Sequence, residues 1–407
     1  MSLSDVKHQA AAQRMIQRAL QRDRFPHAYI FHGPDGVGKE MVARGLGQLL
    51  LCPAPAHREF PPRDAHPIGL NELRMGCGTC ADCRMVMADT HPDWHLIYRQ
   101  LNRDHPDPDV RKRKGLDIGV DVLRHFVIDR VALTPSRARA KVFVIREADR
   151  ITPQAQNALL KTLEEPPGTT FIILLAASLD RLLATTQSRC QVVAFDILPA
   201  DFVMKKLGDL LPQLSGDQRE WYSRMSDGSL GLALESAEDQ LFDVNQRVVA
   251  ELAKWATGGG SANSKPWMEE AESLGERHRK RDPDITDTEA TRRGMKTVFR
   301  LAAAWFADVI RVSQDLGADR PSQSSLFEGA PASARRESLA ILNQSQSAPL
   351  AKAAAQTDAE TAAAAIQRIV QAERQLDLNA TPQLIMETLV NDLVRISIAT
   401  VRDRASR

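Results

Sequence analysis

Short runs of apolar and β-branched residues recur in the first half of the chain and predict buried strands. The clearest run is VFVI at 142–145, and a second run, TFIILL, covers 170–175. Unbroken apolar runs of this length are typical of parallel strands that are covered on both faces. Similar runs at 28–31, within 91–98 and at 192–195 predict three more strands.

A helix with clear start and stop signals joins the two longest runs. Thr152 is a suitable N-cap and Pro153 suits the first helical position, while the sequence PPG at 166–168 ends the helix. Strands that alternate with helices indicate an α/β domain with a parallel sheet, the arrangement of nucleotide-binding domains. Further amphipathic helices in this half are predicted at 6–21, 41–51 and 119–131.

The second half of the chain predicts helices without strands. Two short helices, at 201–211 and 217–225, suggest a small lid. Apolar residues at helical spacing then predict longer amphipathic helices. These longer helices are expected at 294–312, 351–374 and 381–398.

Two polar segments interrupt the helical pattern. Residues 256–292 begin with a Gly-Gly-Gly-Ser run, and residues 313–347 are rich in Ser, Ala, Gln and Pro. We interpret both as flexible insertions or linkers. The predicted domains are therefore an α/β domain at 1–197, a helical lid at 198–250 and a helical domain at 251–407.

Length and composition narrow the classes of protein. A chain of 407 residues exceeds one compact core, so two or three domains are expected. The formal net charge of +1 and the aromatic content of 5% disfavour a protein that coats nucleic acid by charge or by base stacking. No apolar stretch reaches the length of a membrane helix and no signal-peptide pattern is present, so we expect a cytoplasmic protein without a membrane partner.

A glycine-rich loop, GPDGVGK at 33–39, connects the first predicted strand to a predicted helix. In this context glycines turn backbone N–H groups toward phosphate oxygens, and a lysine adds charge at the helix N-terminus. The candidate phosphate-binding residues are Gly33, Gly36, Gly38 and Lys39. The complete motif continues with Ser or Thr, whose hydroxyl binds Mg²⁺, but here Glu40 follows. A degenerate phosphate loop and a plain glycine turn both remain open on this motif alone.

A cluster of cysteines follows the helix after this loop. Cys77, Cys80 and Cys83 form the sequence CGTCADC, and Cys52 closes the preceding helix. Overlapping Cys-x-x-Cys steps place thiolates on one turn, and four thiolates complete a tetrahedral zinc site without an open position. Five cysteines in a chain without secretion signals favour metal binding or burial over disulfides. We predict a structural zinc module at about 52–83, with incidental buried cysteines as the alternative.

Other polar groups allow two interpretations. Nearby histidines could compete as metal ligands, although four cysteines already satisfy zinc; they are His57, His66, His91 and His95. The basic run at 111–114 is more simply a solvated loop than a DNA contact. The basic turn at 137–141, which contains Arg137, Arg139 and Lys141, could face a phosphate backbone or be ordinary surface.

The sequence NALLKTLEEPP at 157–167, followed by Ser-Arg-Cys at 188–190, resembles the clamp-loader branch of the AAA+ ATPases. The chain is most similar to the delta-prime family of bacterial DNA polymerase III, over roughly residues 8–235. The resemblance implies a P-loop AAA+ parallel-sheet domain, a small helical lid and an all-α collar through which subunits assemble. Delta-prime proteins carry a similar four-cysteine module, although the gap at 53–76 is longer and richer in proline here.

The resemblance also implies that nucleotide-handling residues are missing. An active ATPase of this class ends the strand at 142–145 with Asp-Glu, which serve Mg²⁺ and the attacking water. This chain has Arg146-Glu147 instead, and an arginine would repel the metal. Gly231 stands where motor subunits carry an ATP-contacting arginine. Together with Glu40 these losses predict weak or absent ATP binding, no Mg²⁺ site and no intrinsic ATPase activity.

One arginine retains a functional assignment. In the clamp-loader family the arginine of Ser-Arg-Cys reaches the ATP site of a neighbouring subunit, which makes Arg189 the candidate catalytic residue in trans. A planar guanidinium spans two phosphate oxygens and offsets charge that develops during phosphoryl transfer. A surface ion pair is the alternative interpretation of Arg189.

The sequence thus predicts a non-hydrolysing clamp-loader subunit of the DNA polymerase III holoenzyme that helps load the sliding clamp onto primed DNA. Expected partners are the motor and delta subunits in a hetero-pentameric ring, the sliding clamp and primed DNA. One alternative is an active motor subunit with unconventional Mg²⁺ ligands. The other is a zinc-dependent DNA-binding module on an inactive ATPase scaffold.

Overall fold

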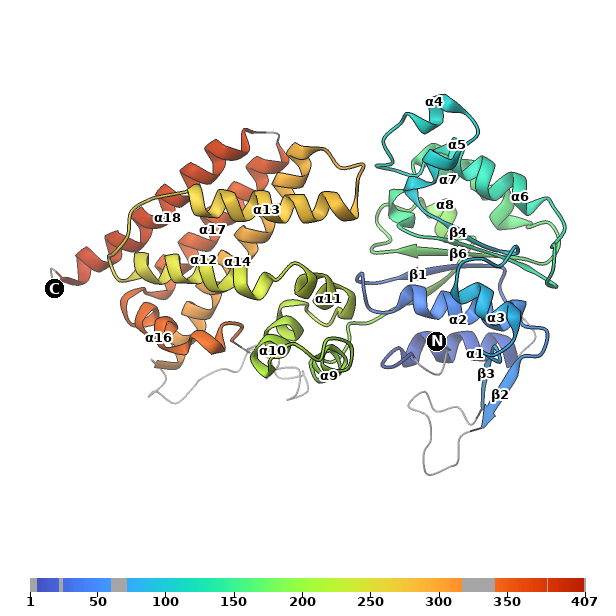
Figure 1. Cartoon of the computed structure of the whole chain (residues 1–407), viewed down its shortest axis with the longest axis horizontal. Coiled ribbons are helices and arrows are strands. Elements are labelled where there is room, and N and C mark those ends of the chain that lie inside the picture. Colours follow the sequence, from blue (N-terminus) through green and yellow to red (C-terminus); the bar gives the residue numbers. More distant parts are fainter. Residues whose placement is uncertain (1–5, 22–24, 60–71, 317–340, 379, 406–407) are drawn as a thin grey trace. The chain divides into compact units, whose positions relative to one another are not determined.

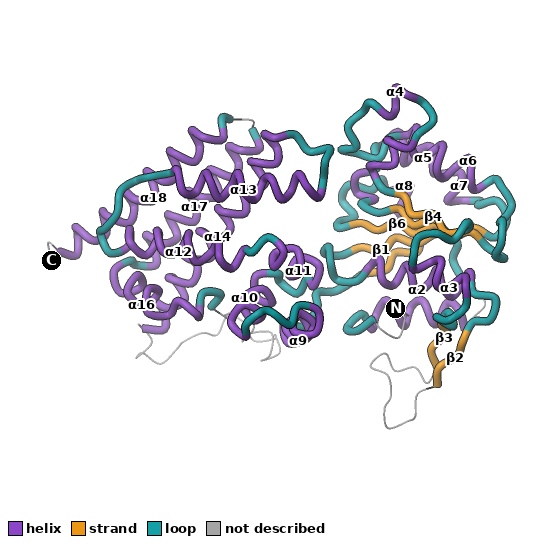
Figure 2. Tube along the Cα trace, viewed as in Figure 1, coloured by secondary structure: helices purple, strands orange, loops and turns teal. Residues whose placement is uncertain are grey.

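The computed structural model describes residues 6–21, 25–59, 72–316, 341–378 and 380–405. They form two compact units. The first contains residues up to 203 together with 227–232, and the second contains 204–226 together with the chain from 233 onward. The first unit is an α/β domain, whereas the described part of the second unit is helical (Figure 2).

Five parallel strands form the sheet of the first unit, in the order β4-β5-β6-β1-β7. The strands are β1 (Ala28–His32), β4 (Trp94–Ile97), β5 (Lys141–Ile145), β6 (Thr170–Ala176) and β7 (Gln191–Ala194). β5 is buried along its whole length, and β1 and β6 are buried except for one residue each. The five predicted strands are therefore confirmed, and their apolar runs are explained by cover on both faces.

Helices cover both faces of this sheet (Figure 1). On one face lie α1 (Ala10–Gln21), α2 (Lys39–Leu51) and α3 (Ala81–Met87); on the other lie α5 (Val120–Leu123), α6 (Asp129–Val131), α7 (Pro153–Glu164) and α8 (Ala184–Gln187). A π-helical turn, Arg124–Ile128, joins α5 to α6, so the helix predicted at 119–131 is one continuous helical segment. The predicted N-cap of α7 is also confirmed, because the Thr152 hydroxyl accepts the N–H of Ala155 at 3.4 Å.

Two short helical segments and a hairpin complete the first unit. A 3₁₀ segment (Arg99–Asp104) and α4 (Pro108–Arg111) follow β4. The antiparallel strands β2 (Ala56–Glu59) and β3 (Glu72–Met75) lie in the sequence between Cys52 and Cys77. The sequence suggested only a long gap here, because these strands are short and carry charged residues. Residues 60–71 of that gap lie outside the described residues.

The second unit consists of helices joined by short connections in the parts described. α9 (Ala200–Leu210) and α11 (Leu230–Glu238) cross the boundaries of the units, and α10 (Gly216–Met225) begins with a capping box between Ser215 and Gln218. The remaining helices are α12 (Leu241–Ala256), α13 (Lys265–Arg281), α14 (Asp287–Leu316), α16 (Ser347–Gln356), α17 (Ala359–Asp377) and α18 (Pro382–Ala405). The helices predicted at 294–312 and 381–398 correspond to α14 and α18. The single helix predicted at 351–374 is instead two helices, because α16 ends at Gln356 and Asp358 caps the start of α17.

The expectation of a flexible insertion at 256–292 is wrong for most of its length. α13 occupies 265–281, and its Trp267, Ala271 and Leu274 are buried. These three residues recur at helical spacing and form the buried face of α13. The prediction missed this face because most of the residues around it are charged, and the segment as a whole resembles a polar linker. The ring of Trp267 lies 5.5 Å from that of Trp255, centroid to centroid, which anchors α13 on α12. Most of the second expected insertion, 317–340 within 313–347, lies outside the described residues.

Asp308 holds the chain where it returns at 341–346. Its carboxylate is fully buried and accepts the backbone N–H groups of Leu342 and Asn343. The side-chain amide of Asn343 donates to the same carboxylate at 2.8 Å, and the amide of Asn245 on α12 donates to Asn343 at 2.7 Å. A buried carboxylate needs such partners, so this network fixes the segment against α12 and α14.

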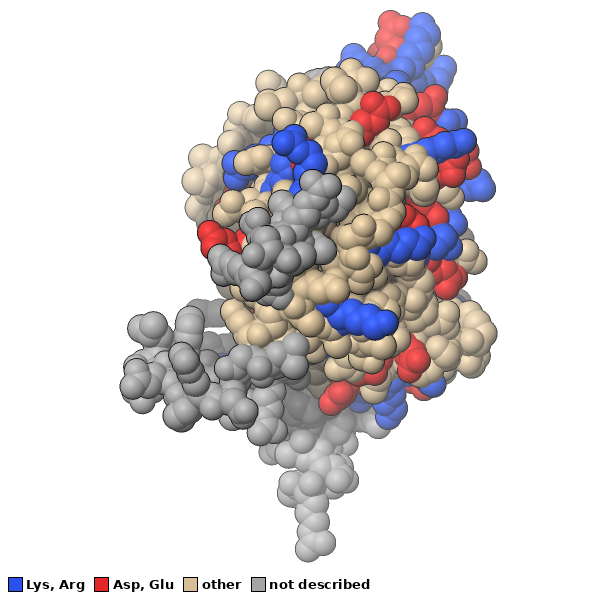
Figure 3. Space-filling model, turned by 90° about the vertical axis from the view of Figure 1, so that its left-hand side faces the viewer, with Lys and Arg blue, Asp and Glu red and all other residues tan. Residues whose placement is uncertain are grey.

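The surface of the second unit agrees with the near balance of charge. Figure 3 shows a face on which uncharged residues dominate the visible part and Lys and Arg alternate with Asp and Glu along one side. Among the described residues, no helix combines the length and the apolar character that are needed to span a lipid bilayer.

α13 and α14 pack so closely at Gly294 that a side chain there would overlap the carbonyl oxygen of Ala271. We expect Gly294→Ala to lower the free energy of unfolding by about 1–3 kcal/mol, the range for overpacked cores. Gly216→Ala on α10 is the matched control, since nothing lies within 4 Å of a methyl group there. Urea denaturation followed by tryptophan fluorescence measures both. A Gly294→Ala protein as stable as the wild type would contradict the close packing.

Candidate functional site

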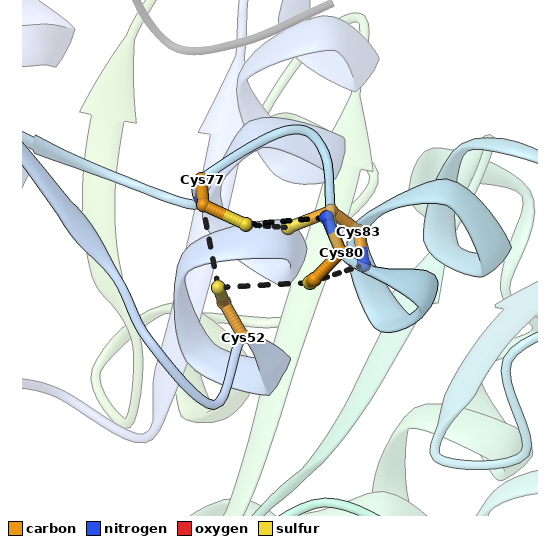
Figure 4. A group of neighbouring side chains, drawn as sticks. All are labelled: Cys52, Cys77, Cys80 and Cys83. Carbon is orange, nitrogen blue, oxygen red and sulfur yellow. Dashed lines mark hydrogen bonds between the residues drawn. The ribbon is translucent and has the colours of Figure 1, made fainter.

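Four cysteines converge beside the end of α2 (Figure 4). Cys52 follows α2, Cys77 follows β3, Cys80 is the N-cap of α3 and Cys83 lies in its first turn. Their sulfur atoms all lie within 4.8 Å of one another, and the Cys52–Cys80 and Cys77–Cys83 pairs are each 3.9 Å apart. The structure therefore brings together all four cysteines that the sequence selected.

The cluster has the dimensions and the chemistry of a structural zinc site. A tetrahedral zinc with bonds of about 2.3 Å to sulfur requires sulfur atoms about 3.8 Å apart. Backbone N–H groups also point at the sulfurs: Cys80 N donates to Cys77 Sγ and Cys83 N to Cys80 Sγ, both at 3.3 Å. The hydrogen bonds from Cys80 and Thr79 lower the pKa of Cys77 to about 6. These residues fit zinc, and four thiolates leave no ligand position open for catalysis.

The histidines considered as competing ligands have other partners. His91 Nε2 pairs with Asp82 Oδ1 at 3.2 Å, and His95 stacks on Phe143 with ring centroids 4.5 Å apart. His66 and the side chain of His57 lie outside the described part of the chain. The described side chains therefore leave the cysteines as the metal-ligand candidates at this position.

The lysine of the glycine loop fills its own loop. Lys39 Nζ donates to the carbonyl of Gly33, to the carbonyl of Pro34 at 2.8 Å and to Asp35 Oδ1 at 3.1 Å. An ammonium has three N–H donors, so all three are engaged inside the loop. Only 7% of the lysine side chain is exposed. A nucleotide phosphate would have to displace these contacts in order to reach Lys39.

Residues at the start of α11 close the same loop from the other side. Ser229 Oγ donates to the carbonyl of Asp35 at 2.6 Å, and Gly231 N donates to the carbonyl of Gly36 at 3.1 Å. A Cβ atom on Gly231 would lie 2.6 Å from the Cα of Gly36. Consequently no side chain fits at position 231, which gives a steric reason for the absence of the arginine that the resemblance placed there.

Gln9 adds a contact that sequence reasoning missed. Its Nε2 donates to the carbonyls of Val37 at 3.2 Å and Asp196 at 2.8 Å, and its Oε1 accepts the N–H of Asp196 at 3.1 Å. The side chain is buried and ties the start of α1 to the glycine loop. A lone glutamine at the start of a polar helix carries no sequence signal for such a role.

Glu40 and Arg146, the two residues at the expected metal positions, bind each other. Arg146 Nε lies 2.7 Å from Glu40 Oε2 and Nη2 lies 2.5 Å from Oε1, a bidentate pair. Arg44 also donates to Glu40 Oε1, at 2.9 Å from its Nε. Burial tends to raise the pKa of Glu40, but the hydrogen bonds and charges of Arg146 and Arg44 lower it overall. Glu40 therefore takes its compensating positive charge from the protein.

The ion pairs continue from Glu40 to the cysteine module. Arg44 forms a second bidentate pair with Asp89, at 2.7 and 2.9 Å. Asp89 follows α3 and also accepts the indole N–H of Trp94 at 2.9 Å. The helix that carries Cys83 is thus connected through Asp89 and Arg44 to Glu40.

Glu147 already has partners within the protein. It is the residue that would polarise a water molecule in an active ATPase. Its carboxylate accepts Arg99 Nε at 3.0 Å and lies 3.5 Å from Arg150 Nε. Asp149 does not replace the missing aspartate in this structure, because its Oδ1 accepts the N–H of Ala177 at 3.1 Å. Each acidic residue after β5 is therefore engaged by the protein itself.

Arg189 lies beside the last turn of α7. Its Nε donates to Glu164 Oε1 at 2.6 Å, and Nη2 pairs with the same oxygen. Nη1 donates to the carbonyl of Thr185 at 2.8 Å, and 29% of the side chain is exposed. The structure does not bring Arg189 to the glycine loop of its own chain, since it precedes β7 at the opposite edge of the sheet.

The basic segments differ in availability. Lys141 is buried and donates to the carbonyls of Arg130, Val131 and Leu133, so its assignment to a surface turn is wrong. The sequence does not show that Lys141 is buried. It follows Arg137 and Arg139, so it was grouped with them as part of a surface turn. Arg137 pairs with Asp82. In the run 111–114, three of the cations have partners in the same unit: Arg111 with His105 O, Lys112 with Asp109 and Arg113 with Asp121.

Comparison with known proteins agrees with this architecture. The sequence family described as "DNA polymerase III, delta subunit" matches residues 8–199. DNA polymerase III subunit delta' of Pseudomonas aeruginosa is 31% identical over 208 residues, which cover 51% of this chain and 55% of that protein. The protein of the same name from Escherichia coli is 28% identical over 235 residues, 58% of this chain and 61% of that protein.

Over residues 8–199 the chain is similar to the DNA polymerase III subunits named delta'. It spans about half the length of the curated relatives that it matches. Among solved structures, a gamma-subunit-related protein of DNA polymerase III from Thermotoga maritima aligns over 95% of this chain and 99% of its own, with 15% identity and a TM-score of 0.42. The parallel five-stranded sheet with helices on both faces and the helical second unit match the α/β and all-α parts of the fold class expected from the sequence.

Zinc is expected to bind at one ion per chain. Cys77→Ser should lose the ion and lower the unfolding temperature, because metal binding at a structural site contributes directly to folding. Elemental analysis and thermal unfolding measure the two effects. Cys190→Ser is the control, since that thiol lies outside the cluster. Equal zinc content in wild type and Cys77→Ser would argue against a four-sulfur site.

The pKa of Glu40 gives the ion pair a pH signature. Its folded pKa lies below the ordinary value of 4.5, so the stabilisation is present above that pH and is lost as the pH falls through the folded pKa. Glu40→Gln should cost about 1.5 kcal/mol at pH 7, the lower end for hydrogen bonds to charged groups because both partners are partly exposed.

Urea denaturation of wild type and Glu40→Gln at pH 7 and at pH 3 tests this pH dependence. The difference in the free energy of unfolding between the two proteins should be smaller at pH 3 than at pH 7. Glu272→Gln, a change of an exposed glutamate on α13, is the control. A difference that is independent of pH would show that Glu40 acts through packing and not through charge.

Proposed function

We propose that this chain is a non-hydrolysing clamp-loader subunit of a DNA polymerase III holoenzyme, and that it presents Arg189 to ATP on a neighbouring subunit. The observation that supports this most is the bidentate pair between Glu40 and Arg146 at the two expected metal positions. A guanidinium beside Glu40 repels Mg²⁺, and phosphoryl transfer in this class requires the metal. The engaged ammonium of Lys39 supports the same conclusion.

The position of Arg189 supports action on another molecule. The glycine loop follows β1 at the carboxyl edge of the sheet, whereas Arg189 precedes β7 at the amino edge, where Gln191 is in register with Tyr29. A parallel five-residue strand such as β1 spans about 13 Å from end to end. Arg189 therefore lies at the opposite edge of the sheet from its own glycine loop, as a residue that serves a neighbouring ATP site would.

The proposed partners follow from the family. The chain would assemble through its helical second unit with motor and delta subunits in a hetero-pentameric ring, and would help to load the sliding clamp onto primed DNA. Zinc in the four-cysteine cluster would stabilise the module between α2 and α3. The rival role of an active motor subunit requires the Glu40–Arg146 pair to open for Mg²⁺. The rival role of a zinc-dependent DNA-binding module finds little support in the paired cations of the 111–114 run.

A reconstituted loader with clamp and primed DNA tests the role of Arg189. Arg189→Ala should abolish the contribution of the ATP site that Arg189 serves, because an arginine finger in trans is worth about 10³–10⁵ in rate at that site. Total ATP turnover should fall in part, since other sites keep their own arginines, and clamp loading should fall further. Arg18→Ala, which changes an exposed arginine of α1, is the control.

Assembly must be measured on the same samples by size-exclusion chromatography. Unchanged turnover and loading in an assembled Arg189→Ala complex would reduce Arg189 to a surface residue. Magnesium-dependent ATP hydrolysis by the isolated chain, lost in Lys39→Ala, would overturn the non-hydrolysing part of the proposal.

A further inference from the structure

Glu164 is the residue that holds the side chain of Arg189. It is the last residue of α7, and its Oε1 accepts from Nε and Nη2 of the guanidinium, with 2.6 Å to Nε. The carbonyl of Thr185 accepts from Nη1 at 2.8 Å. Two acceptors from different elements therefore fix the plane of the guanidinium. A single contact would leave the group free to rotate.

The contacts leave part of the guanidinium available. An arginine side chain has five N–H donors, and three are used by Glu164 and Thr185. The remaining donors are one N–H on Nη1 and one on Nη2, the two nitrogens at the end of the side chain. Two parallel N–H groups are the arrangement that binds a pair of phosphate oxygens. Arg189 can thus keep both contacts and still receive a phosphate.

Glu164 belongs to a rigid element, whereas Arg189 does not. α7 is capped by Thr152, and its Leu159 and Leu163 are fully buried against the sheet. Arg189 lies in the short connection between α8 and β7. A carboxylate at the C-terminal end of a helix is disfavoured by the helix dipole. The stability of α7 therefore does not explain why an acidic residue stands at its C-terminal end. The hydrogen bond from Arg189 to Glu164 does explain it.

We propose that Glu164 is a positioning residue for Arg189, which it holds with two N–H groups directed outward to the phosphates of a neighbouring subunit. The proposal rests on the proposed function, since it assigns Glu164 a part in what Arg189 does. The role requires an oxygen that accepts hydrogen bonds from the guanidinium. Glutamine has such an oxygen in its side-chain amide, so Glu164→Gln should keep the function. Glu164→Ala should lose it, because alanine has no acceptor.

The experiment compares ATP turnover by the reconstituted loader, with clamp and primed DNA, for wild type, Glu164→Ala, Glu164→Gln and Arg189→Ala. The difference between wild type and Arg189→Ala defines the turnover that depends on Arg189. Glu164→Ala should lower this part about tenfold through kcat, with KM for ATP unchanged; a misplacement of about 1 Å can cost up to about 10²-fold. Glu164→Gln should stay within about twofold of wild type.

Two controls separate positioning from a general disturbance. Glu165→Gln alters the neighbouring exposed carboxylate and should leave turnover unchanged. The double variant Glu164→Ala/Arg189→Ala should be no slower than Arg189→Ala alone, because Glu164 acts only through Arg189. Glu164 is 48% exposed, so the variants should fold and assemble as the wild type does, which thermal unfolding and size-exclusion chromatography check.

Distinct outcomes would overturn distinct statements. If Arg189→Ala lowers turnover and Glu164→Ala does not, Glu164 has no positioning role while the proposed function stands. If both Glu164 variants raise turnover, the carboxylate masks the arginine and the positioning role is wrong. If Arg189→Ala itself has no effect, the proposed function fails and the role of Glu164 fails with it.

Discussion

Glu40 and Arg146 join two parts of the sheet edge that would otherwise carry unbalanced charge. Glu40 lies in the first turn of α2, the helix after β1, and Arg146 follows β5, which is separated from β1 by β6. Either residue alone would destabilise this edge, since breaking one partner of a partly buried pair leaves an uncompensated charge. Together they form a bidentate ion pair at the two positions where the resemblance to AAA+ ATPases predicted a hydroxyl and a carboxylate for Mg²⁺.

The cysteine module takes part in the same arrangement. α3 supplies Cys83 to the cluster, and Arg44 donates to the carbonyl of Val86 near the end of α3 as well as to Asp89. At the other side of α3, Asp82 pairs with Arg137 and His91. A zinc ion that orders α3 would therefore also order the ion pairs of Arg44 with Asp89 and Glu40. Through Asp82 it would order the turn at 136–138, whose N–H groups donate to Asp93. This gives a non-catalytic metal a physical role.

Sequence patterns predicted the parts of the fold that depend on local signals. The buried strands, the capped start of α7 and the four cysteines were recovered because apolar runs, Thr-Pro and Cys-x-x-Cys spacing each reflect a local constraint. α13 was missed because its buried stripe of Trp267, Ala271 and Leu274 is embedded in charge. The role of Lys141 was missed because only its tertiary neighbours, three backbone carbonyls, distinguish it from a surface lysine.

For the candidate site, the sequence identified which residues had changed but not how the changes combine. Glu40 and Arg146 are 106 positions apart, and each was interpreted as a loss on its own. Only the fold shows that the two substitutions compensate each other. The same holds for Gly231, whose lack of a side chain lets the backbone approach Gly36.

A loop that is filled by its own protein has a consequence for the proposed role. The contacts of Lys39, Ser229 and Gln9 supply the loop with partners from the protein itself: its own carbonyls, the start of α11 and the segment after β7. Arg189 is placed by its contacts with Glu164 and Thr185 and by the register of β7 on β1. A subunit built in this way would keep its arginine in a constant position while ATP-driven changes take place in its neighbours. In the proposed role, the filled loop at one end of the strands and the partly exposed arginine at the other end would both serve a subunit of constant geometry.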